Sequence, residues 1–261
     1  MRNPDSHKGE NGKVAIIGGS SHIHGAPIFA ALAAEASGVD LVFITIPACN
    51  AEAAKMASLN FQVYPFQTDE LTRDDVNVTL QMLAIMDCAV IGPGLSRNAK
   101  TQSAMEQIIT GCPCPMVLDA TALQPNTLSL VAGRNAVITP HLGELERMDM
   151  KQDQIAEHAQ RSGTVILLKG HIDHIAAPDG TVRLVEGGNA GLTVGGTGDA
   201  LAGLIAGFIA QKMEPVEASA LASTLIKKAG DQLYSEQGFS YTTEDVIERI
   251  PRLMHEMSLV A

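Results

Sequence analysis

A glycine-rich stretch that runs into an apolar segment carries the clearest chemical signal in this sequence. It reads Gly187-Gly-Asn-Ala-Gly-Leu-Thr-Val-Gly-Gly-Thr-Gly-Asp199 and continues into an Ala/Leu/Ile-rich run over 200–210. Glycines this dense usually supply positive φ angles or let the backbone approach a ligand closely. The run after Asp199 is typical of a buried helix, so Gly196, Thr197 and Gly198 would lie at its N-terminus. Unpaired N–H groups there predict an anion hole.

Asp199 follows the glycines directly and is the candidate catalytic base. A carboxylate beside such a nest could take a proton from a hydroxyl while the nest holds the phosphate that the hydroxyl attacks. The alternative is an ordinary helix N-cap, a position that aspartate favours. Two better-known glycine motifs are absent, because Leu201 stands where the dinucleotide fingerprint needs glycine and no Gly-Lys-Ser/Thr follows.

Further polar and glycine signals follow the aliphatic runs that are expected to be strands. They are Gly18-Gly-Ser-Ser21, Gly92-Pro-Gly94, Asp119, Thr139-Pro-His141 and Lys169-Gly170. Ligands bind beyond the carboxyl ends of strands in parallel sheets, so these signals predict one shared cleft. His141 could hydrogen-bond a ligand there or have a structural role. His22 and His24 lack a carboxylate companion, and no metal ligands are assigned.

The elements that would position these residues alternate along the chain. Strands are expected at 13–19, 40–46, 60–64, 88–91, 115–118, 136–138, 164–169, 172–177 and 181–186. Helices are expected at 25–37, 50–57, 72–85, 99–110, 152–161, 199–211, 215–236 and 243–257. Aliphatic strands that alternate with helices predict an α/β fold with a mainly parallel sheet covered on both faces. Pro178-Asp-Gly180 predicts a late antiparallel hairpin near one edge. Without a linker-like segment or a repeat, 1–261 is expected to be a single domain.

Composition narrows the class of protein. Hydrophobic residues make up 46% of the 261 residues but aromatic residues only 3%, so the core is expected to be aliphatic. A net charge of −11 argues against nucleic-acid or anionic-membrane partners, so local N–H groups and a few basic residues must hold any phosphate. The four cysteines form no Cys-x-x-Cys pair and no apolar signal core is present, which favours reduced thiols and a cytoplasmic location.

Six motifs in a fixed order resemble those of one family. They are Ser6-His-Lys-Gly-Glu-Asn-Gly12, Ile91-Gly-Pro-Gly-Leu95, Leu118-Asp-Ala-Thr-Ala-Leu123, Thr139-Pro-His-Leu-Gly-Glu144, Leu168-Lys-Gly170, and Gly188-Asn-Ala-Gly191 with Gly195-Gly-Thr-Gly-Asp199. Together they closely resemble the ADP/ATP-dependent NAD(P)H-hydrate dehydratases of the ribokinase-like superfamily. The resemblance runs from Ser6 to Pro251 and implies a ribokinase-like three-layer α/β/α sandwich.

The resemblance implies a repair reaction. Enzymes of this family convert the S epimers of NADH and NADPH hydrated at C6 back to the cofactors. ADP or ATP phosphorylates the C6 hydroxyl, and loss of phosphate completes the dehydration. Mg²⁺ is expected with the nucleotide, and a homo-oligomer is expected for the protein.

Carried onto this chain, the family pattern assigns residues to each ligand. Asp199 would be the base, and Gly196, Thr197 and Gly198 the anion hole. The residues implied for the hydrate, beside Asp199, are Ala26, Gly94 and His141. Those implied for the nucleotide are Lys169, Gly170, His171, Ile172, Asp173, Asn189 and Gly198.

Three departures from the family pattern stand at Leu142, Thr121 and 171–174, and the last leaves the choice between ADP and ATP open. Two other functions share parts of this pattern. A ribokinase-like vitamin or thiazole kinase would use the same Gly-Thr-Gly-Asp, and a non-catalytic nucleotide-binding regulator would need no base. The Ser6–Gly12 segment and the Thr139–Glu144 motif favour the dehydratase over the kinase.

Overall fold

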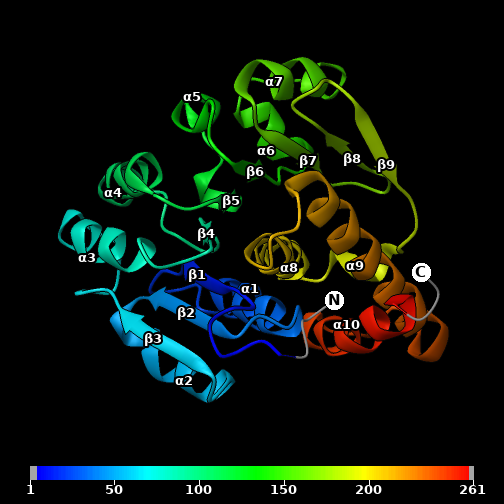
Figure 1. Cartoon of the computed structure of the whole chain (residues 1–261), viewed down its shortest axis with the longest axis horizontal. Coiled ribbons are helices and arrows are strands. Elements are labelled where there is room, and N and C mark those ends of the chain that lie inside the picture. Colours follow the sequence, from blue (N-terminus) through cyan, green and yellow to red (C-terminus); the bar gives the residue numbers. More distant parts are fainter. Residues whose placement is uncertain (1–4, 259–261) are drawn as a thin grey trace.

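The computed structural model describes residues 5–258, so both ends of the expected 1–261 domain lie outside the described part. Within it, nine strands form one sheet in the order β3-β2-β1-β4-β5-β6-β7-β8-β9 (Figure 1). The strands are β1 Lys13–Ile17, β2 Leu41–Ile46, β3 Phe61–Pro65, β4 Cys88–Ile91, β5 Met116–Leu118, β6 Ala136–Ile138, β7 Val165–Leu168, β8 Asp173–Ala176 and β9 Val182–Val185. The neighbours from β3 to β7 pair in parallel.

The sheet is buried on both faces, which explains its uninterrupted aliphatic strands. In β1, Val14 and Ile16 pack into one core, whereas Ala15 and Ile17 pack into the other. All four side chains are fully buried. Successive side chains of a strand point to opposite faces, so a strand covered on both sides must be apolar throughout.

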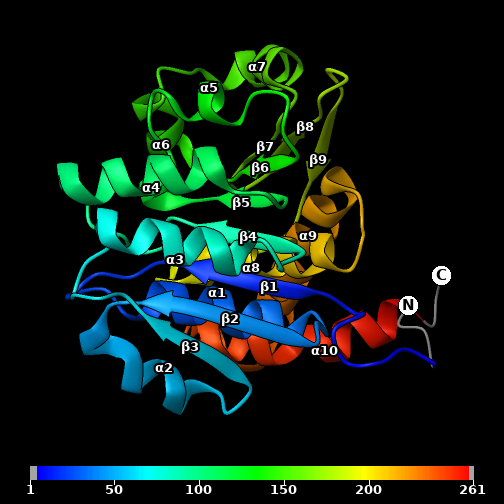
Figure 2. The same ribbon diagram turned by 60° about the vertical axis from the view of Figure 1, so that its left-hand side comes forward.

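Helices cover the two faces of the sheet in separate groups (Figures 1 and 2). On one face lie α1 Gly25–Ala36, α2 Ala51–Ala57, α8 Thr197–Ala210, α9 Pro215–Gln237 and α10 Thr243–Ser258. On the other lie α3 Arg73–Leu83, α4 Ala99–Gly111, α5 Thr127–Val131, α6 Leu142–Arg147 and α7 Ile155–Ser162. The predicted α/β/α layers with a mainly parallel sheet are confirmed.

The late hairpin is confirmed as well. Strand β8 pairs antiparallel with β7 and with β9, which forms one edge of the sheet. Every predicted strand and helix has a counterpart, but α5 and α6 were not predicted. They have five and six residues, too few for a helical repeat of apolar positions to be read.

The chain reverses its direction of winding between β1 and β4. It proceeds outward from β1 through β2 to β3 and then returns to place β4 on the other side of β1. Ligand sites in open α/β sheets form at such a switch point. The two loops at this point touch, since the Gly19 N–H donates to the Pro93 carbonyl at 2.8 Å. A Cβ on Gly18 would lie only 2.4 Å from that same oxygen.

Candidate active site

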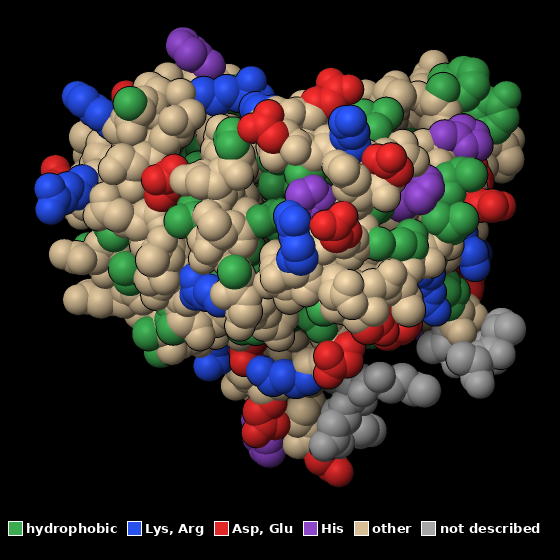
Figure 3. All heavy atoms as spheres, turned by 90° about the horizontal axis from the view of Figure 1, so that it is seen from above, with side chains coloured by type: hydrophobic (Ala, Val, Ile, Leu, Met, Phe, Trp, Pro, Cys, Tyr) green, Lys and Arg blue, Asp and Glu red, His purple; other side chains and the backbone are tan. Residues whose placement is uncertain are grey.

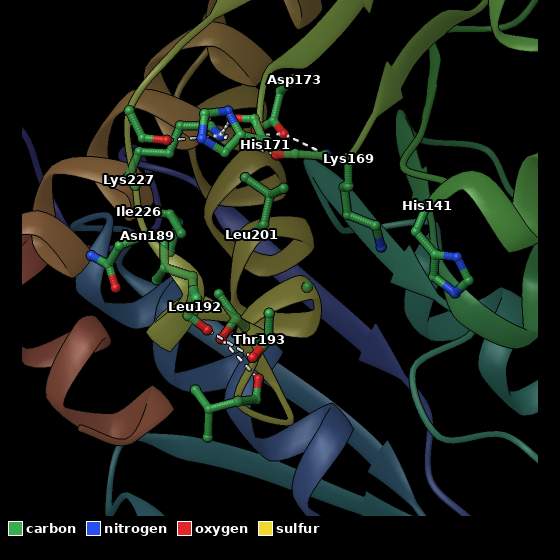
Figure 4. A pocket seen from close by; sticks show the side chains of 17 residues that line it. His141, Lys169, His171, Asp173, Asn189, Leu192, Thr193, Leu201, Ile226 and Lys227 are labelled. Atoms are coloured by element: carbon green, nitrogen blue, oxygen red, sulfur yellow. Dashed lines mark hydrogen bonds and ion pairs between the residues drawn. The ribbon is translucent and has the colours of Figure 1, made fainter. Parts of the chain in front are cut away.

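A cavity of about 670 Å³ opens beside the carboxyl end of β7 and the N-terminus of α8. Figure 4 shows Lys169 and His141 on one side of it and Asn189 and Leu192 on the other. The predicted site residues in its lining are His141, Lys169, Gly170, His171, Asp173, Asn189, Thr197 and Gly198. The structure therefore brings most of the residues predicted for the nucleotide to one cavity.

The N-terminus of α8 is the predicted anion hole, and its shape depends on glycine. Gly196 caps the helix with a φ of 102°, and a Cβ there would lie 2.3 Å from the Phe29 ring of α1. The first turn closes when the Ala200 N–H donates to the Gly196 carbonyl at 2.9 Å. The N–H groups of Thr197 and Gly198 precede that bond and point out of the helix end. An anion would therefore meet backbone donors.

The Thr197 side chain stabilises the loop that precedes α8. Its hydroxyl donates to the Val194 carbonyl at 3.0 Å, while the Thr243 hydroxyl of α10 donates to the Gly195 carbonyl at 2.9 Å. Both bonds hold the loop in front of α8 in place. The Thr197 hydroxyl is thus engaged within the protein, and its backbone N–H is the group left for an anion.

Asp199 is the third residue of α8, so the alternative prediction that it caps the helix is wrong. The cap is Gly196, whose left-handed backbone was not evident from the sequence. Burial raises the pKa of the Asp199 carboxyl to about 7, and the negative charges of Asp119 and Glu144 act in the same direction. The ammonium of Lys169 opposes them. A carboxyl that titrates near neutral pH is well matched to act as a general base.

Lys169 lies among three carboxylates at the end of β7. Its Nζ is 2.7 Å from Asp119 Oδ1 and 3.7 Å from Glu144 Oε2. Burial works against the charge, but Asp119, Glu144 and Asp199 together raise the pKa of Lys169 above its usual value. A Cβ on Gly198 would lie 3.2 Å from this ammonium, so the glycine lets Lys169 approach the helix N-terminus.

Asp119 and Glu144 are two carboxylates of this site. Asp119 was expected in the shared cleft, but no individual role was predicted for either residue. Both are buried, at 2% and 6% exposure. The Thr139 hydroxyl also donates to Asp119 Oδ1, at 2.9 Å. Their signal was present, since each stands in a quoted motif at a strand end. Their shared contact with Lys169 depends on the order of β5, β6 and β7 in the sheet, which the sequence alone does not give.

His141 has a clear structural role. Its Nδ1 accepts the N–H groups of Gly143 at 3.0 Å and Glu144 at 3.3 Å and so caps α6. The backbone N–H of His141 donates to Glu144 Oε2 at 3.0 Å, which completes a capping box. A parallel bridge to Lys169 places it at the cavity wall. Its contact with the hydrate stays a prediction.

Hydrogen bonds to the buried Asp173 side chain stabilise the loop from Lys169 to Asp173. Asp173 is buried; it accepts the Gly170 N–H at 2.8 Å and the Ser223 hydroxyl at 2.7 Å. The His171 side chain is exposed in the cavity, whereas Ile172 is half-buried and outside the lining. Asp173 therefore shapes the predicted nucleotide loop through its contacts with the chain.

Lys227, on α9, is a buried partner of this loop that sequence reasoning missed. Its Nζ donates to the carbonyls of His171 at 2.9 Å, Gly170 at 3.2 Å and Gly187 at 3.3 Å. It also lies 3.6 Å from Asp173 Oδ1. The ammonium thus ties both glycine-containing segments of the cavity wall to one helix.

The Asn189 side chain is engaged within the protein. Its Oδ1 accepts the Gly191 N–H at 3.0 Å and the Tyr241 hydroxyl at 2.7 Å, and its Nδ2 donates to Asp231 at 3.2 Å. The residue lines the cavity, as expected of a nucleotide contact, and its role toward phosphate remains a prediction.

Ala26 and Gly94 come together at the switch point, outside the lining of this cavity. Gly94 has a φ of 69°, and a Cβ on it would lie 3.2 Å from the Ala26 Cβ and 2.9 Å from the Ile23 side chain. The absence of a side chain at Gly94 leaves room above α1. Their role in binding the hydrate stays a prediction.

Three further features bear on possible partners: the surface charge, the grouping of metal-ligating side chains and the hydropathy of the helices. On the face shown in Figure 3, Lys and Arg side chains are interspersed with Asp and Glu. Among residues 5–258, no group of three or more His, Cys, Asp or Glu side chains could hold a metal ion. No helix in that range is long and apolar enough to cross a membrane.

The mainly parallel sheet and the Gly-Thr-Gly-Asp helix start define a protein of the ribokinase-like class. A family model described as NAD(P)H-hydrate dehydratase matches residues 14–252. The chain therefore belongs to the NAD(P)H-hydrate dehydratase family, as the motifs predicted.

Three similar proteins support this assignment. ADP-dependent (S)-NAD(P)H-hydrate dehydratases from Nitrosopumilus maritimus and Cenarchaeum symbiosum are 37% and 36% identical, over 97% of this chain and 92% of each relative. The crystal structure of the ADP/ATP-dependent NAD(P)H-hydrate dehydratase from Bacillus subtilis, co-crystallized with ATP/Mg²⁺, is 27% identical with a TM-score of 0.82. That comparison covers 98% of this chain and 93% of the other.

Proposed function

We propose that this protein is a hydro-lyase that uses ADP or ATP to dehydrate the S epimers of C6-hydrated NADH and NADPH. Membership of the family and the names of its relatives support the reaction. The observation that carries the chemistry is the half-buried Asp199 carboxyl, whose pKa is raised to about 7 beside unpaired N–H groups and the Lys169 ammonium.

The first step is phosphoryl transfer to the hydrate. Asp199 takes the proton of the C6 hydroxyl as the oxygen attacks the terminal phosphorus of the nucleotide, and the bond to the nucleotide's bridging oxygen breaks. Hydroxide leaves poorly and phosphate leaves well, so the C6–O bond of the new phosphate ester then breaks. A proton leaves the adjacent ring carbon C5, and the C5=C6 double bond of the reduced nicotinamide ring is restored. Asp199 acts as the base, with its pKa near the working pH.

The N-terminus of α8 and Lys169 stabilise the charge that moves in this step. The N–H groups of Thr197 and Gly198 are fixed donors for the transferring phosphoryl group, and they need no reorganisation. Lys169 adds a positive charge on the side of β7. Because Asp119 and Glu144 keep it protonated, it remains a cation throughout the cycle.

The two ligands approach the helix N-terminus from two sides. Gly198 faces Lys169 of the cavity, where residues 169–173 and Asn189 bind the nucleotide. Gly196 faces Phe29 of α1, on the side where Ala26 and Gly94 meet. We assign the hydrate to that side, with His141 between the two. This arrangement puts the C6 hydroxyl and the terminal phosphate at the same helix end.

Mg²⁺ enters this proposal as part of the nucleotide complex. Bound Mg²⁺ usually keeps several waters and phosphate oxygens as ligands. The described residues have no acidic cluster that could hold it alone, so no step above passes through it. We further propose a single domain over 1–261 that works as a cytoplasmic homo-oligomer without nucleic-acid or membrane partners.

A spectrophotometric assay tests the function. The protein is incubated with the separated S and R epimers of hydrated NADH or NADPH, Mg²⁺ and either ADP or ATP. Recovery of the absorbance of the reduced nicotinamide ring is expected with the S epimers only. Phosphorylation of a vitamin or thiazole alcohol without this recovery would instead indicate a kinase. Nucleotide binding without any turnover would indicate a regulator.

A further inference from the structure

The turn that follows β5 holds a backbone conformation that its sequence does not favour. Ala120 has a φ of 55°, in the left-handed region that alanine rarely adopts. The turn also packs closely against Gly92 at the switch point. A Cβ on Gly92 would lie only 2.0 Å from the Asp119 carbonyl oxygen. Residues kept in such conformations are held by their surroundings and cluster at functional sites.

Arg147 supplies that hold from α6. Its Nε donates to the Leu123 carbonyl and its Nη2 to the Ala120 carbonyl, each at 3.1 Å. The same guanidinium lies 3.7 Å from Glu144 Oε1, and the other oxygen of Glu144 lies 3.7 Å from Lys169. One side chain thus fixes both ends of the turn and balances the charge of the neighbouring carboxylate.

We infer that Arg147 is a positioning residue: it fixes the Asp119–Leu123 turn so that Asp119 and Glu144 hold Lys169 beside Asp199. This inference rests on the function proposed above. The charges of Asp119 after β5, Glu144 on α6 and Lys169 after β7 all act on the Asp199 carboxyl at the start of α8. Loss of the guanidinium frees the strained turn and leaves Glu144 with Lys169 and the His141 imidazole, each 3.7 Å from its Oε2.

Arg147→Met tests the inference, with Arg134→Met as the matched control. Arg134 also donates to backbone carbonyls, those of Ile109, Thr110 and Cys112, but at the opposite end of the sheet. Arg147→Met should lower kcat roughly 10- to 100-fold, as expected for a small misplacement of catalytic groups, with little change in the nucleotide KM. The acidic limb of its pH–rate profile should move to higher pH, because the negative charge of Glu144 is less compensated and raises the pKa of Asp199 further. Arg134→Met should reduce only thermal stability.

A second substitution separates strain from charge. Glycine adopts a left-handed φ readily. Adding Ala120→Gly to Arg147→Met should therefore recover much of the lost kcat and Tm while the pH limb stays displaced. Equal losses of kcat in the two arginine variants, or an unmoved pH limb in Arg147→Met, would overturn the inference. An inactive wild-type protein would instead reject the proposed function, and the Tm of the double variant would still test the turn.

An independent observation concerns two thiols at the other end of β5. Cys112 and Cys114 are buried, and their Sγ atoms lie 3.6 Å apart. The hydrogen bond from Cys114 lowers the pKa of the Cys112 thiol to about 7; burial opposes this shift and the Arg134 guanidinium adds to it. A cavity of about 400 Å³ is lined by Cys114 together with Pro113, Pro115 and Lys212, and Cys112 lies behind Cys114, outside this lining.

We propose that Cys112 and Cys114 form a site for reversible oxidation by hydrogen peroxide. The Cys112 thiolate attacks one peroxide oxygen, the O–O bond breaks, and hydroxide leaves as the sulfur becomes a sulfenic acid. The Cys114 thiol then attacks that sulfur and the S–O bond breaks. Its proton goes to the departing hydroxide to form water, and a disulfide remains.

Mass spectrometry tests this site. Reduced protein is treated with hydrogen peroxide, quenched, unfolded and alkylated. A Cys112–Cys114 disulfide that dithiothreitol reverses is expected in the wild type and in Cys49→Ser, which removes the exposed thiol. Cys112→Ser and Cys114→Ser should each lack it. Full alkylation of both residues in peroxide-treated wild type, or a disulfide with a different partner, would overturn the proposal.

Discussion

The two ends of the sheet are built from the same strands but contain different kinds of interaction. At the carboxyl ends, buried charges gather around one helix N-terminus: Lys169 contacts Asp119 and Glu144 beside Asp199. At the amino ends, acidic side chains bind backbone. Asp40 accepts the N–H groups of Gly9 at 2.7 Å and Asn11 at 3.1 Å.

The comparison separates motifs that carry chemistry from motifs that secure the fold. The Ser6–Gly12 segment helped to distinguish this family from related kinases, yet it lies on Asp40, directly before β2. The Gly195–Asp199 motif lies at the other end, against Phe29 and Lys169. A motif can therefore be typical of a family because it stabilises the fold, without taking part in the chemistry. Substitutions at the two ends should have different consequences for rate and for stability.

The largest effect is expected for Asp199→Asn. An amide cannot accept the hydroxyl proton, so kcat should fall roughly 10²- to 10⁴-fold, the usual contribution of general base catalysis. Nucleotide affinity, measured by calorimetry, should change little, because the backbone donors and Lys169 remain. A variant that retains near-full turnover would show that another group is the base.

The wild-type protein should show the titration of that base. Because Asp199 must be deprotonated to act, kcat/KM should rise with pH through about pH 7 and then level off. The contribution of Asp199 to folding stability changes with pH in the opposite direction. The folded-state pKa lies above the ordinary value of 3.8, so the folded protein binds the proton more tightly, and Asp199 progressively destabilises the fold as pH rises from about 4 to about 7.

Thermal melts of Asp199→Asn and the wild type at pH 5 and pH 8 test the sign. The stability gained by the variant should be larger at pH 8. An equal difference at both pH values would mean that the carboxyl is not perturbed in the folded state.

A pair of glycine substitutions tests the shape of the anion hole. Gly196→Ala forces a Cβ to within 2.3 Å of Phe29 at a left-handed backbone position, which should cost about 1–3 kcal/mol and distort the donors. Gly195→Ala, one residue earlier, meets no atom within 4 Å. Turnover and Tm should fall in the first variant and stay near wild type in the second. Similar behaviour of the two would remove the steric argument for Gly196.

The sequence allowed most of the fold to be predicted, because aliphatic strands and helices have distinct periods. The arrangement of the site was harder to predict. Asp119 and Glu144 are separated by 25 positions in the chain and both contact Lys169 only because β5, β6 and β7 are neighbours in the sheet. The cap at Gly196 depends on a positive φ, and Lys227 reaches the cavity from a helix whose other buried residues are uncharged. Such features arise from tertiary packing, which no local pattern encodes.

The smallest effect on rate is expected for Asp40→Ala, at the amino end. Its Oδ2 accepts the Gly9 N–H, the Asn11 N–H and the Asn11 side-chain amide, so the variant should lose roughly 1–3 kcal/mol of stability. The kcat at a temperature well below Tm should remain within about twofold of wild type, because surface anchors far from the chemistry act on folding. Denaturant melts and rate measurements on the same preparation check both parts. A large loss of kcat in a fully folded variant would show that the amino end also supports the site, and the division between the two ends would no longer hold.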